Sequence, residues 1–427
     1  NGATNFYEAC QSFWFVQALV QIEANGHSIS PGRFDQYMWP YLEADKNISK
    51  EFAQELIDCL FVLLNHVNKT RDDVSDQAFA GYAVFQNFGV GGQTEDGLDA
   101  TNPVSYMCMD AAAHVRLPAP SFSVRIHNQT PDEFLLRACE LARLGTGVPA
   151  MYNDEAIIPA LCNRGLTLAD ARNYCIIGCV EPQCPHKTDG WHDAAFFNMC
   201  RPLEMVFSNG MDKGVQISVQ TGDVTEMKSF DEFYDAYKKQ MEYFISLLVN
   251  ADNAIDVAHA ERCPLPFLSC MVDDCLKRGK SVQEGGAVYN FTGPQGFGIA
   301  NMADSLYAIR KLVYEEKKMT MEELKEALAW NYGKGIDAQS AADITTIVMQ
   351  KLQENGISVN EQTATAVMTA ALGTEPAPEK KARFEEIHKM IEEVPKFGND
   401  IPDVDYFARD VAYTYTRPLQ KYMNPRG

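Results

Sequence analysis

Residues 174–193 read YCIIGCVEPQCPHKTDGWHD. The apolar run that begins at Cys175 predicts a short strand, and the glycine that follows the run predicts its end. Glu181 lies two residues after Cys179, so in an extended loop both side chains point the same way. Pro182 fixes its own backbone and biases the preceding residue toward extended geometry. The stretch therefore predicts a strand that leads a thiol and a carboxylate, side by side, into a loop.

On either side of this stretch, long helices alternate with short apolar strands, a pattern typical of α/β proteins. Apolar residues at i, i+3, i+4 spacing predict helices over 4–24, 51–68, 102–115, 132–144, 192–208, 230–250, 302–316, 321–331 and 340–355. Extended stretches are predicted over 81–92, 121–127, 148–153, 173–182 and 286–291. The one linker-like stretch, 373–386, returns to helix. We therefore expect one large domain, although the length alone would suggest two or three.

The composition is that of an ordinary globular protein, with 46% of the 427 residues apolar and 22% charged. The sequence carries 37 basic and 58 acidic side chains, for a formal net charge of -21. This acidic balance disfavours nucleic acid and anionic membranes as partners, because both attract an excess of Lys and Arg. No apolar run approaches the ~20 residues that span a bilayer, and the first residues carry no signal-peptide pattern. We expect a cytoplasmic protein with its 12 cysteines reduced.

Several stretches of the sequence nearly match known site motifs, but the residues around them do not fit those motifs. Gly145 begins a G-x-G-x-x-A pattern, but a helix precedes it, which favours a helix C-cap over a dinucleotide-binding loop. The sequence around Ser28, GHSIS, departs from a nucleophile elbow at its last position. Four side chains could chelate zinc, but their spacing matches no compact zinc module. They are Cys179, Cys184, His186 and His192. We therefore expect neither a bound cofactor nor a metal ion.

The pairing of Cys179 with Glu181 restricts the chemistry that the loop can perform. A nearby negative charge raises the pKa of a thiol, so the pair is poorly suited to thiolate catalysis. It suits a sulfur-centred radical that abstracts a hydrogen atom while the carboxylate takes a proton from the same substrate. The structural alternative is that Cys179 is a buried core residue at a strand end and Glu181 is a surface residue.

The loop also resembles a known family. GCVEP (178–182), followed by GWHDAAFFN (190–198), resembles the thiyl-radical loop of the glycyl radical enzymes, the group that contains pyruvate formate-lyase. Further segments resemble the family in the family's order: NGHSISPGRFDQYMWPYLEAD (25–45), FQNFGVGG (85–92), SVRIH (123–127), VPAMYND (148–154), EGGAVYNFTGPQGFG (284–298) and ADSLYAIRKLVYEEKKMTMEELKEAL (303–328). The resemblance covers essentially the whole chain. It implies an α/β fold, a ten-stranded barrel of two antiparallel five-stranded half-barrels surrounded by helices, with Cys179 on a loop inside it.

The resemblance further implies that residues 1–427 form a single barrel domain, truncated at its N-terminus and without the C-terminal glycyl radical domain. The family carries its radical glycine in an RVSGY- or RVAGY-like segment, and no glycine between 373 and 427 has that context. The implied partners are a small-molecule substrate, a second copy in a homodimer, and a radical-SAM activase that installs the protein-based glycyl radical. We expect the chain as given to be inactive alone, and turnover by it after incubation with an activase would contradict this.

Within the family, GCVEPQ and KTDGWHDAAFFN look most like the cobalamin-independent dehydratases of glycerol and propane-1,2-diol. In that subgroup a His-Ser pair and an Asp hold the substrate hydroxyls, and these positions correspond to His27, Ser28 and Asp193. An aromatic pocket residue corresponds to Phe85. Val84 stands where proline-type dehydratases place an Asp, and the loop has one cysteine where pyruvate formate-lyase has two adjacent ones. The alternatives are a choline lyase, a hydroxyproline dehydratase, an arylacetate decarboxylase, a formate C-acetyltransferase, or a non-catalytic split-gene piece.

The implied reaction assigns a role to each of these side chains. Cys179 takes a hydrogen atom from C1 of the diol and Glu181 takes the proton of the hydroxyl on that carbon. His27 is the natural donor to the hydroxide that leaves C2, and Asp193 orients it. Each of the last two has a structural alternative: His27 could cap the following segment, and Asp193 could be an N-terminal charge of the helix expected over 194–208.

Arg125 lies near the end of the extended stretch predicted over 121–127. It could bind a substrate carboxylate, which would favour a decarboxylase or a pyruvate-type reaction. We favour the alternative, an interior arginine paired with an acidic residue. Cys184 departs from the residue expected after EPQ, which weakens the diol assignment slightly.

Overall fold

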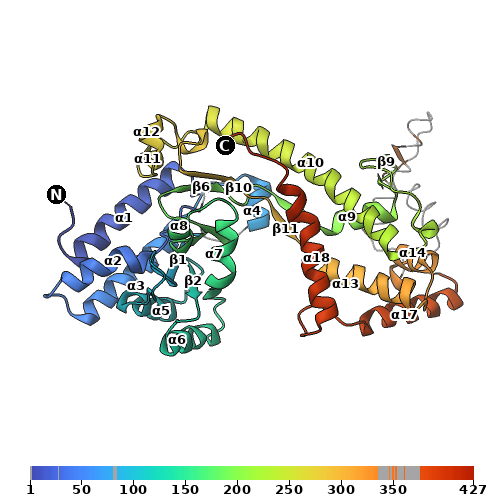
Figure 1. Cartoon of the computed structure of the whole chain (residues 1–427), viewed down its shortest axis with the longest axis horizontal. Helices are drawn as coiled ribbons and strands as arrows, with labels where there is room; N and C mark the ends of the chain where they lie inside the picture. The colour runs from blue at the N-terminus through green and yellow to red at the C-terminus, as the bar shows by residue number, and fades with distance from the viewer. Residues whose placement is uncertain are drawn as a thin grey trace. The chain divides into compact units, whose positions relative to one another are not determined.

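The chain forms two compact units in the computed structural model, which describes residues 2–26, 28–79, 84–334 and 376–427 together with residues 346, 349, 350, 352 and 360 (Figure 1). Unit 1 comprises Asn1–His192, Asp256–Thr292 and Pro425–Gly427. Unit 2 comprises Asp193–Ile255 and Gly293–Asn424. Each unit is therefore assembled from segments that are distant in the sequence.

Several helices of unit 1 begin at residues whose side chains satisfy free backbone N–H groups. Ser49 accepts a hydrogen bond from Phe52 N at the start of α3, and Asn102 forms a capping box with Ser105 at the start of α5. The helices are α1 (Phe6–Glu23), α2 (Phe34–Ala44), α3 (Lys50–His66), α4 (Asp73–Phe79), α5 (Pro103–Val115), α6 (Asp132–Arg143), α7 (Asp154–Cys162), α8 (Leu168–Arg172), α11 (Pro266–Ser269), α12 (Cys275–Arg278) and the short 3-10 helix η2 (Val282–Glu284).

A three-stranded parallel sheet forms the centre of unit 1. Its strands are β1 (Asn87–Gly91), β2 (Ser121–Ile126) and β3 (Ala150–Asn153), in that order. Phe88 of β1 and Phe122 of β2 are almost completely buried, and they pack in one apolar cluster with Phe34 and Phe61 from the helices. Burial of these large side chains stabilises the sheet that carries the site residues below.

Two further strand pairs complete unit 1. The strands β4 (Cys175–Ile177) and β5 (Glu181–Gln183) form an antiparallel hairpin. The strand β6 (Thr188–Trp191) pairs in parallel with β10 (Tyr289–Thr292), which comes much later in the sequence. The cysteine stretch is therefore held on both sides by strand pairing.

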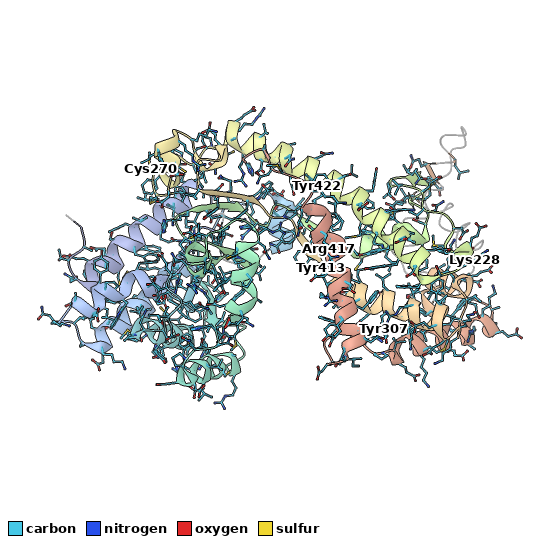
Figure 2. All side chains as sticks on the ribbon, viewed as in Figure 1. Lys228, Cys270, Tyr307, Tyr413, Arg417 and Tyr422 are labelled. Carbon is cyan, nitrogen blue, oxygen red and sulfur yellow. The ribbon has the colours of Figure 1, made fainter. Side chains whose placement is uncertain are left out.

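Unit 2 is mainly helical, with two short strand pairs. Its elements are β7 (Phe196–Asn198), α9 (Cys200–Phe207), β8 (Met211–Asp212), β9 (Val215–Gln216), η1 (Val224–Glu226), the first part of α10 (Phe230–Arg262), β11 (Gln295–Phe297), α13 (Ile299–Ile309) with its continuation η3 (Arg310–Glu315), α14 (Met321–Ala329), η4 (Asn331–Gly333), α17 (Pro378–Glu393) and α18 (Pro402–Leu419). β7 pairs in parallel with β11, and β8 pairs antiparallel with β9. Figure 2 labels Tyr413 and Arg417 on α18, where the guanidinium carbon lies 4.1 Å from the ring centroid.

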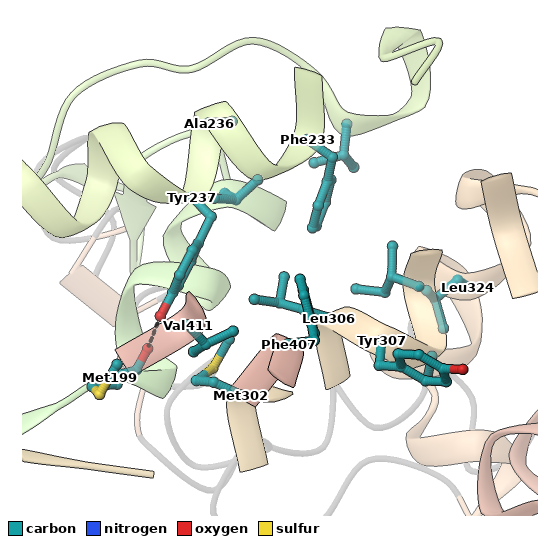
Figure 3. Close-up of a cluster of buried hydrophobic side chains, with 14 of the residues drawn as sticks. Met199, Phe233, Ala236, Tyr237, Met302, Leu306, Tyr307, Leu324, Phe407 and Val411 are labelled. Carbon is teal, nitrogen blue, oxygen red and sulfur yellow. Dashed lines mark hydrogen bonds between the residues drawn. The ribbon is translucent and has the colours of Figure 1, made fainter. Parts of the chain in front are cut away.

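Apolar side chains from α10, α13 and α18 meet in the core of unit 2 (Figure 3). Phe233, Leu306 and Val411 are completely buried there. The hydroxyl of buried Tyr237 donates to the Met199 carbonyl at 3.2 Å, so this polar group stays satisfied inside the core. The unit thus has an apolar core of its own, separate from the cluster around β1 and β2.

The sequence predictions of secondary structure agree with much of this arrangement. The α/β class is confirmed, whereas the ten-stranded barrel is not shown by the strand pairings of the described residues. The helix expected over 192–208 is wrong in its first half, because 196–198 form the strand β7 and α9 begins only at Cys200. The helix expected over 340–355 lies mostly outside the described residues. Within the described ranges, no helix combines the length and the apolar character needed to cross a membrane.

Candidate active site

Cys179 lies at the tip of the β4–β5 hairpin. Ile177 pairs with Glu181 at the last register position before the tip, which leaves 178–180 as a three-residue loop. Gly178 has a φ of 58°, a left-handed conformation that residues with a Cβ adopt at a cost. Three-residue hairpin loops commonly need one left-handed residue, so this glycine allows the chain to reverse directly before Cys179.

The thiol and the carboxylate differ in exposure. Cys179 is exposed, whereas Glu181 is only 7% exposed. The N–H of Val180 donates to Glu181 Oε2 at 2.8 Å, which turns the carboxylate back toward the loop. The structural alternative, with a buried cysteine and a surface glutamate, is therefore wrong on both counts. The loop thus presents an accessible sulfur next to a buried carboxylate.

Ser28 and Ser30 bring the segment before α2 against the hairpin tip. Ser30 Oγ accepts the N–H groups of Gly178 at 3.1 Å and Asn87 at 2.9 Å. Asn87 Nδ2 in turn donates to the Gly178 carbonyl at 3.1 Å. A methyl group placed on Gly178 would lie 3.6 Å from Ser28 Oγ and 3.0 Å from Glu181 Oε2. The Ser28 hydroxyl and the Glu181 carboxylate thus both lie close to Gly178.

Tyr152 contacts the loop from β3. Its hydroxyl donates to the Cys179 carbonyl at 3.0 Å. Burial raises the pKa of Tyr152 to about 12, and the negative charges of Glu181 and Cys179 act in the same direction. The phenol therefore stays protonated, and remains a hydrogen-bond donor, near neutral pH.

A buried ion pair supports the strand that leads into the hairpin. Arg125 is 1% exposed and Asp154 is completely buried, and the two form a double hydrogen bond of 3.0 and 2.8 Å. Arg125 also donates to the carbonyls of Tyr174 at 2.7 Å and of Arg172 at 2.8 Å, immediately before β4. The Tyr174 hydroxyl donates to the same Asp154 at 2.8 Å. Arg125 is thus the interior, paired arginine that we favoured over a ligand for a substrate carboxylate.

The structure places the predicted substrate-binding residues as follows. Ser28 lies at the hairpin tip, with a left-handed φ of 54°. Phe85 is half-buried two residues before β1, and His27 lies outside the described residues. Asp193 belongs to unit 2, in the turn after β6. It is not the N-terminal charge of a helix over 194–208, because β7 occupies the start of that range.

The remaining sequence predictions concern cofactors, metals and thiols. No disulfide joins any of the 12 cysteines in the part of the chain that the structure describes, and their reduced state stays an expectation. Gly145 follows α6 and its N–H donates to the Ala142 carbonyl at 3.1 Å, as expected for a helix C-cap. Among the side chains that the structure describes, no three His, Cys, Asp or Glu residues gather as a metal-binding group would.

Sequence reasoning missed the residues that hold the loop. Ser30, Asn87 and Tyr152 all lie in segments that resemble the family, but no local pattern selects them. They act on backbone atoms of a loop that is far away in the sequence, so only the fold reveals their contacts. Asn87 and Tyr152 are polar residues inside short strands, whereas Ser30 lies outside the strands and carries no such signal.

The comparisons with known proteins agree on one family. The model of the family described as "Pyruvate formate lyase-like" matches residues 1–427. A (2S)-3-sulfopropanediol dehydratase of Klebsiella oxytoca is 40% identical over 337 residues, which cover 77% of this chain and 40% of the relative.

Two solved structures are closely similar. A structure of 1,2-propanediol dehydration in Roseburia inulinivorans has 61% sequence identity and a TM-score of 0.94, and the match covers all of this chain and 51% of that one. The glycerol-bound B12-independent glycerol dehydratase of Clostridium butyricum has 54% identity and a TM-score of 0.85, with 100% and 48% covered. The chain thus spans about half the length of these relatives. It belongs to the pyruvate formate-lyase-like family, the glycyl radical enzymes, as its GCVEP loop implies.

Proposed function

We propose that the whole protein is a glycyl radical dehydratase that removes water from a small vicinal diol such as propane-1,2-diol or glycerol. The observation that carries this proposal is the tip of the β4–β5 hairpin, where an exposed Cys179 lies beside the buried carboxylate of Glu181 and the hydroxyl of Ser28. The names of the three relatives support it, since they specify a sulfopropanediol, 1,2-propanediol and glycerol.

The hairpin tip suits the first half of this reaction. A glycyl radical, installed elsewhere in the whole protein, would take the hydrogen atom of the Cys179 thiol, so that the S–H bond breaks, a C–H bond forms on the glycine and a sulfur radical remains. The exposed Cys179 sulfur then takes a hydrogen atom from C1, and Glu181 accepts the proton of the C1 hydroxyl. Ser28 binds a substrate hydroxyl beside Glu181, which orients C1 toward the sulfur.

The second half of the reaction needs an acid at the other hydroxyl. The C2–O bond breaks and the oxygen leaves as water after it receives a proton from His27, which Asp193 orients. The Cys179 thiol then returns its hydrogen atom to C2, so the products are an aldehyde and water, with no net oxidation. Phe85 lines the pocket. The roles of His27, Phe85 and Asp193 rest on the family resemblance.

The remaining features of the whole protein follow from the same assignment. A radical-SAM activase would install the glycyl radical, and the substrate would react inside a ten-stranded barrel of two antiparallel half-barrels. This barrel rests on the family resemblance. We place the enzyme in the cytoplasm, as a homodimer with no bound cofactor.

The test is turnover of defined diols by the full-length protein after anaerobic activation. We expect an aldehyde from propane-1,2-diol or glycerol, detected by coupling to an alcohol dehydrogenase. The Cys179→Ala variant should accumulate the glycyl radical, measured by electron paramagnetic resonance, and yet form no aldehyde. The matched control is Cys270→Ala, which removes another exposed thiol and should leave turnover unchanged.

Two outcomes would revise the proposal. Absence of aldehyde from every diol, including 3-sulfopropanediol, in a preparation that carries the radical would end the assignment to diols. If Cys179→Ala abolishes turnover while His27→Ala does not, the family chemistry stands and the role given to His27 is removed.

A further inference from the structure

We infer that Tyr152 is a positioning residue for the radical step, which it serves by fixing the backbone between Cys179 and Glu181. This inference rests on the proposed function for its catalytic consequence, and on the structure alone for the contact itself. Tyr152 lies on β3 and donates its phenol hydrogen to the Cys179 carbonyl at 3.0 Å.

The contact forms one half of a clamp on a single peptide unit. The carbonyl of Cys179 accepts from Tyr152, and the N–H of the same peptide, on Val180, donates to Glu181 Oε2 at 2.8 Å. Because a peptide unit is planar, hydrogen bonds at its oxygen and at its nitrogen together fix its orientation. That orientation sets where the Cys179 side chain leaves the backbone and where the Glu181 carboxylate ends.

The clamp joins the exposed tip of the hairpin, Cys179 and Val180, to the central sheet. The tip itself belongs to no strand. Tyr152 instead lies on a strand of the central sheet, opposite Arg125 in the pairing of β2 with β3. Arg125 is fixed by its buried pair with Asp154. The hydrogen bond from the phenol therefore fixes the loop relative to the sheet.

The other contacts on the loop lie one residue earlier. Ser30 and Asn87 hold the N–H and the carbonyl of Gly178. The hydrogen bond of Tyr152 thus fixes the following peptide, which joins Cys179 to Val180. Its pKa of about 12 keeps the hydroxyl protonated, so the clamp does not open near neutral pH.

Loss of the phenol hydroxyl should affect the radical step more than substrate binding. A misplacement of reacting groups of the order of 1 Å can cost ~100-fold in rate, and loss of one neutral hydrogen bond should give a smaller shift. We expect Tyr152→Phe to lower kcat by about 10-fold. KM should change less than about twofold, because the side chain acts on the loop and not on the diol.

The experiment uses the full-length protein, activated anaerobically, with propane-1,2-diol and its C1-deuterated form. Tyr152→Phe should form as much glycyl radical as the unmodified protein, and its deuterium isotope effect on kcat should be larger, because hydrogen transfer has become slower. The matched control is Tyr234→Phe, whose phenol also donates to a backbone carbonyl, that of Asp410 at 3.3 Å in unit 2. This control should leave kcat, KM and the isotope effect unchanged.

A second measurement does not depend on turnover. In the protein before activation, amide hydrogen exchange of the peptide that covers 175–183 should be faster in Tyr152→Phe than in the unmodified protein, because the Val180 N–H is less well held. An unchanged exchange rate, or a lower kcat with an unchanged isotope effect, overturns the role of Tyr152. Faster exchange in a protein that dehydrates no diol retains the clamp and overturns the proposed function instead.

Discussion

The two antiparallel hairpins in the described part of the chain are of similar size but are held in different ways. The hairpin of β8 and β9 turns at Lys213 and Gly214, which have φ values of 45° and 79°. Two left-handed residues in succession are typical of a type I′ turn, which closes a hairpin by its local geometry. The β4–β5 hairpin instead takes contacts at its tip from Ser30, Asn87 and Tyr152.

The comparison shows what a hairpin needs if it is to place a reactive atom. A turn that is closed by its own backbone preference can be exposed and can tolerate movement. If the β4–β5 loop presents the Cys179 sulfur to a substrate, as we propose, it needs contacts from elements whose positions are fixed by a core. The conformation of the β4–β5 hairpin therefore depends on residues far away in the sequence.

The largest difference between the hairpins should appear when the ion pair beside each is broken. Asp154→Asn leaves the Arg125 guanidinium buried without its carboxylate, which typically costs ~3–5 kcal/mol. Asp212, on β8, pairs with Arg201 at 2.7 Å, but about a third of each side chain is exposed. Asp212→Asn should therefore cost ~0–1 kcal/mol. Urea unfolding of the two variants measures both values.

Equal losses of stability in these two variants would contradict the comparison. It would mean that the Arg125–Asp154 pair is no more important to the fold than an exposed one. Asp154→Asn tests the charge with little change of shape, so a large loss cannot be attributed to a cavity.

A smaller difference should follow from alanine at the glycine of each turn. Both substitutions place a Cβ at a positive φ, for a backbone cost of ~1–2 kcal/mol. The new Cβ would have no neighbour within 4 Å at Gly214 but would lie 3.0 Å from Glu181 Oε2 at Gly178. We expect similar melting temperatures for Gly178→Ala and Gly214→Ala, with a loss of diol turnover of about 10-fold only in Gly178→Ala. Unimpaired turnover in Gly178→Ala would show that the Glu181 carboxylate tolerates displacement.

The smallest effect is a difference in thiol reactivity within the β4–β5 hairpin, which needs no substitution. Cys179 is exposed, whereas Cys175 is buried and has its pKa raised by burial to about 11. At pH 8, iodoacetamide should therefore modify Cys179 and the exposed Cys270, labelled in Figure 2, well before Cys175. Peptide mass spectrometry over time gives the three rates. Modification of Cys175 as fast as that of Cys179 would mean that the hairpin opens readily.

Sequence reasoning identified the elements whose signals are local. The extended stretch 121–127 corresponds to β2, and the helix expected over 102–115 corresponds to α5, which has its cap and its apolar face in consecutive residues. The helix expected over 192–208 is wrong because Phe196 and Phe197 pair with residues about a hundred positions away in β11. Apolar spacing within a window cannot report such a pairing.

The site was predictable to the extent that its residues form a motif. GCVEP identifies the thiol and the carboxylate, but not that Cys179 is exposed and Glu181 is buried, because burial depends on the elements packed around them. The extended stretch 173–182 is in fact a hairpin, since Gly178 reverses the chain. The contact of Tyr152 could not be predicted from the sequence, because its partner is a backbone carbonyl and every residue has one.

The parallel pairing of β6 with β10 has a consequence for the nascent chain. Thr188 of β6 pairs with Tyr289 of β10, so translation must add all of α10 before the partner strand exists. At a synthesis rate of ~5–20 residues per second, roughly 5–20 s pass between the two strands. During this interval the edge of β6 that will bind β10 is open to other strands. The segment that follows the β4–β5 hairpin is therefore a part of unit 1 that ribosome-bound chaperones would protect.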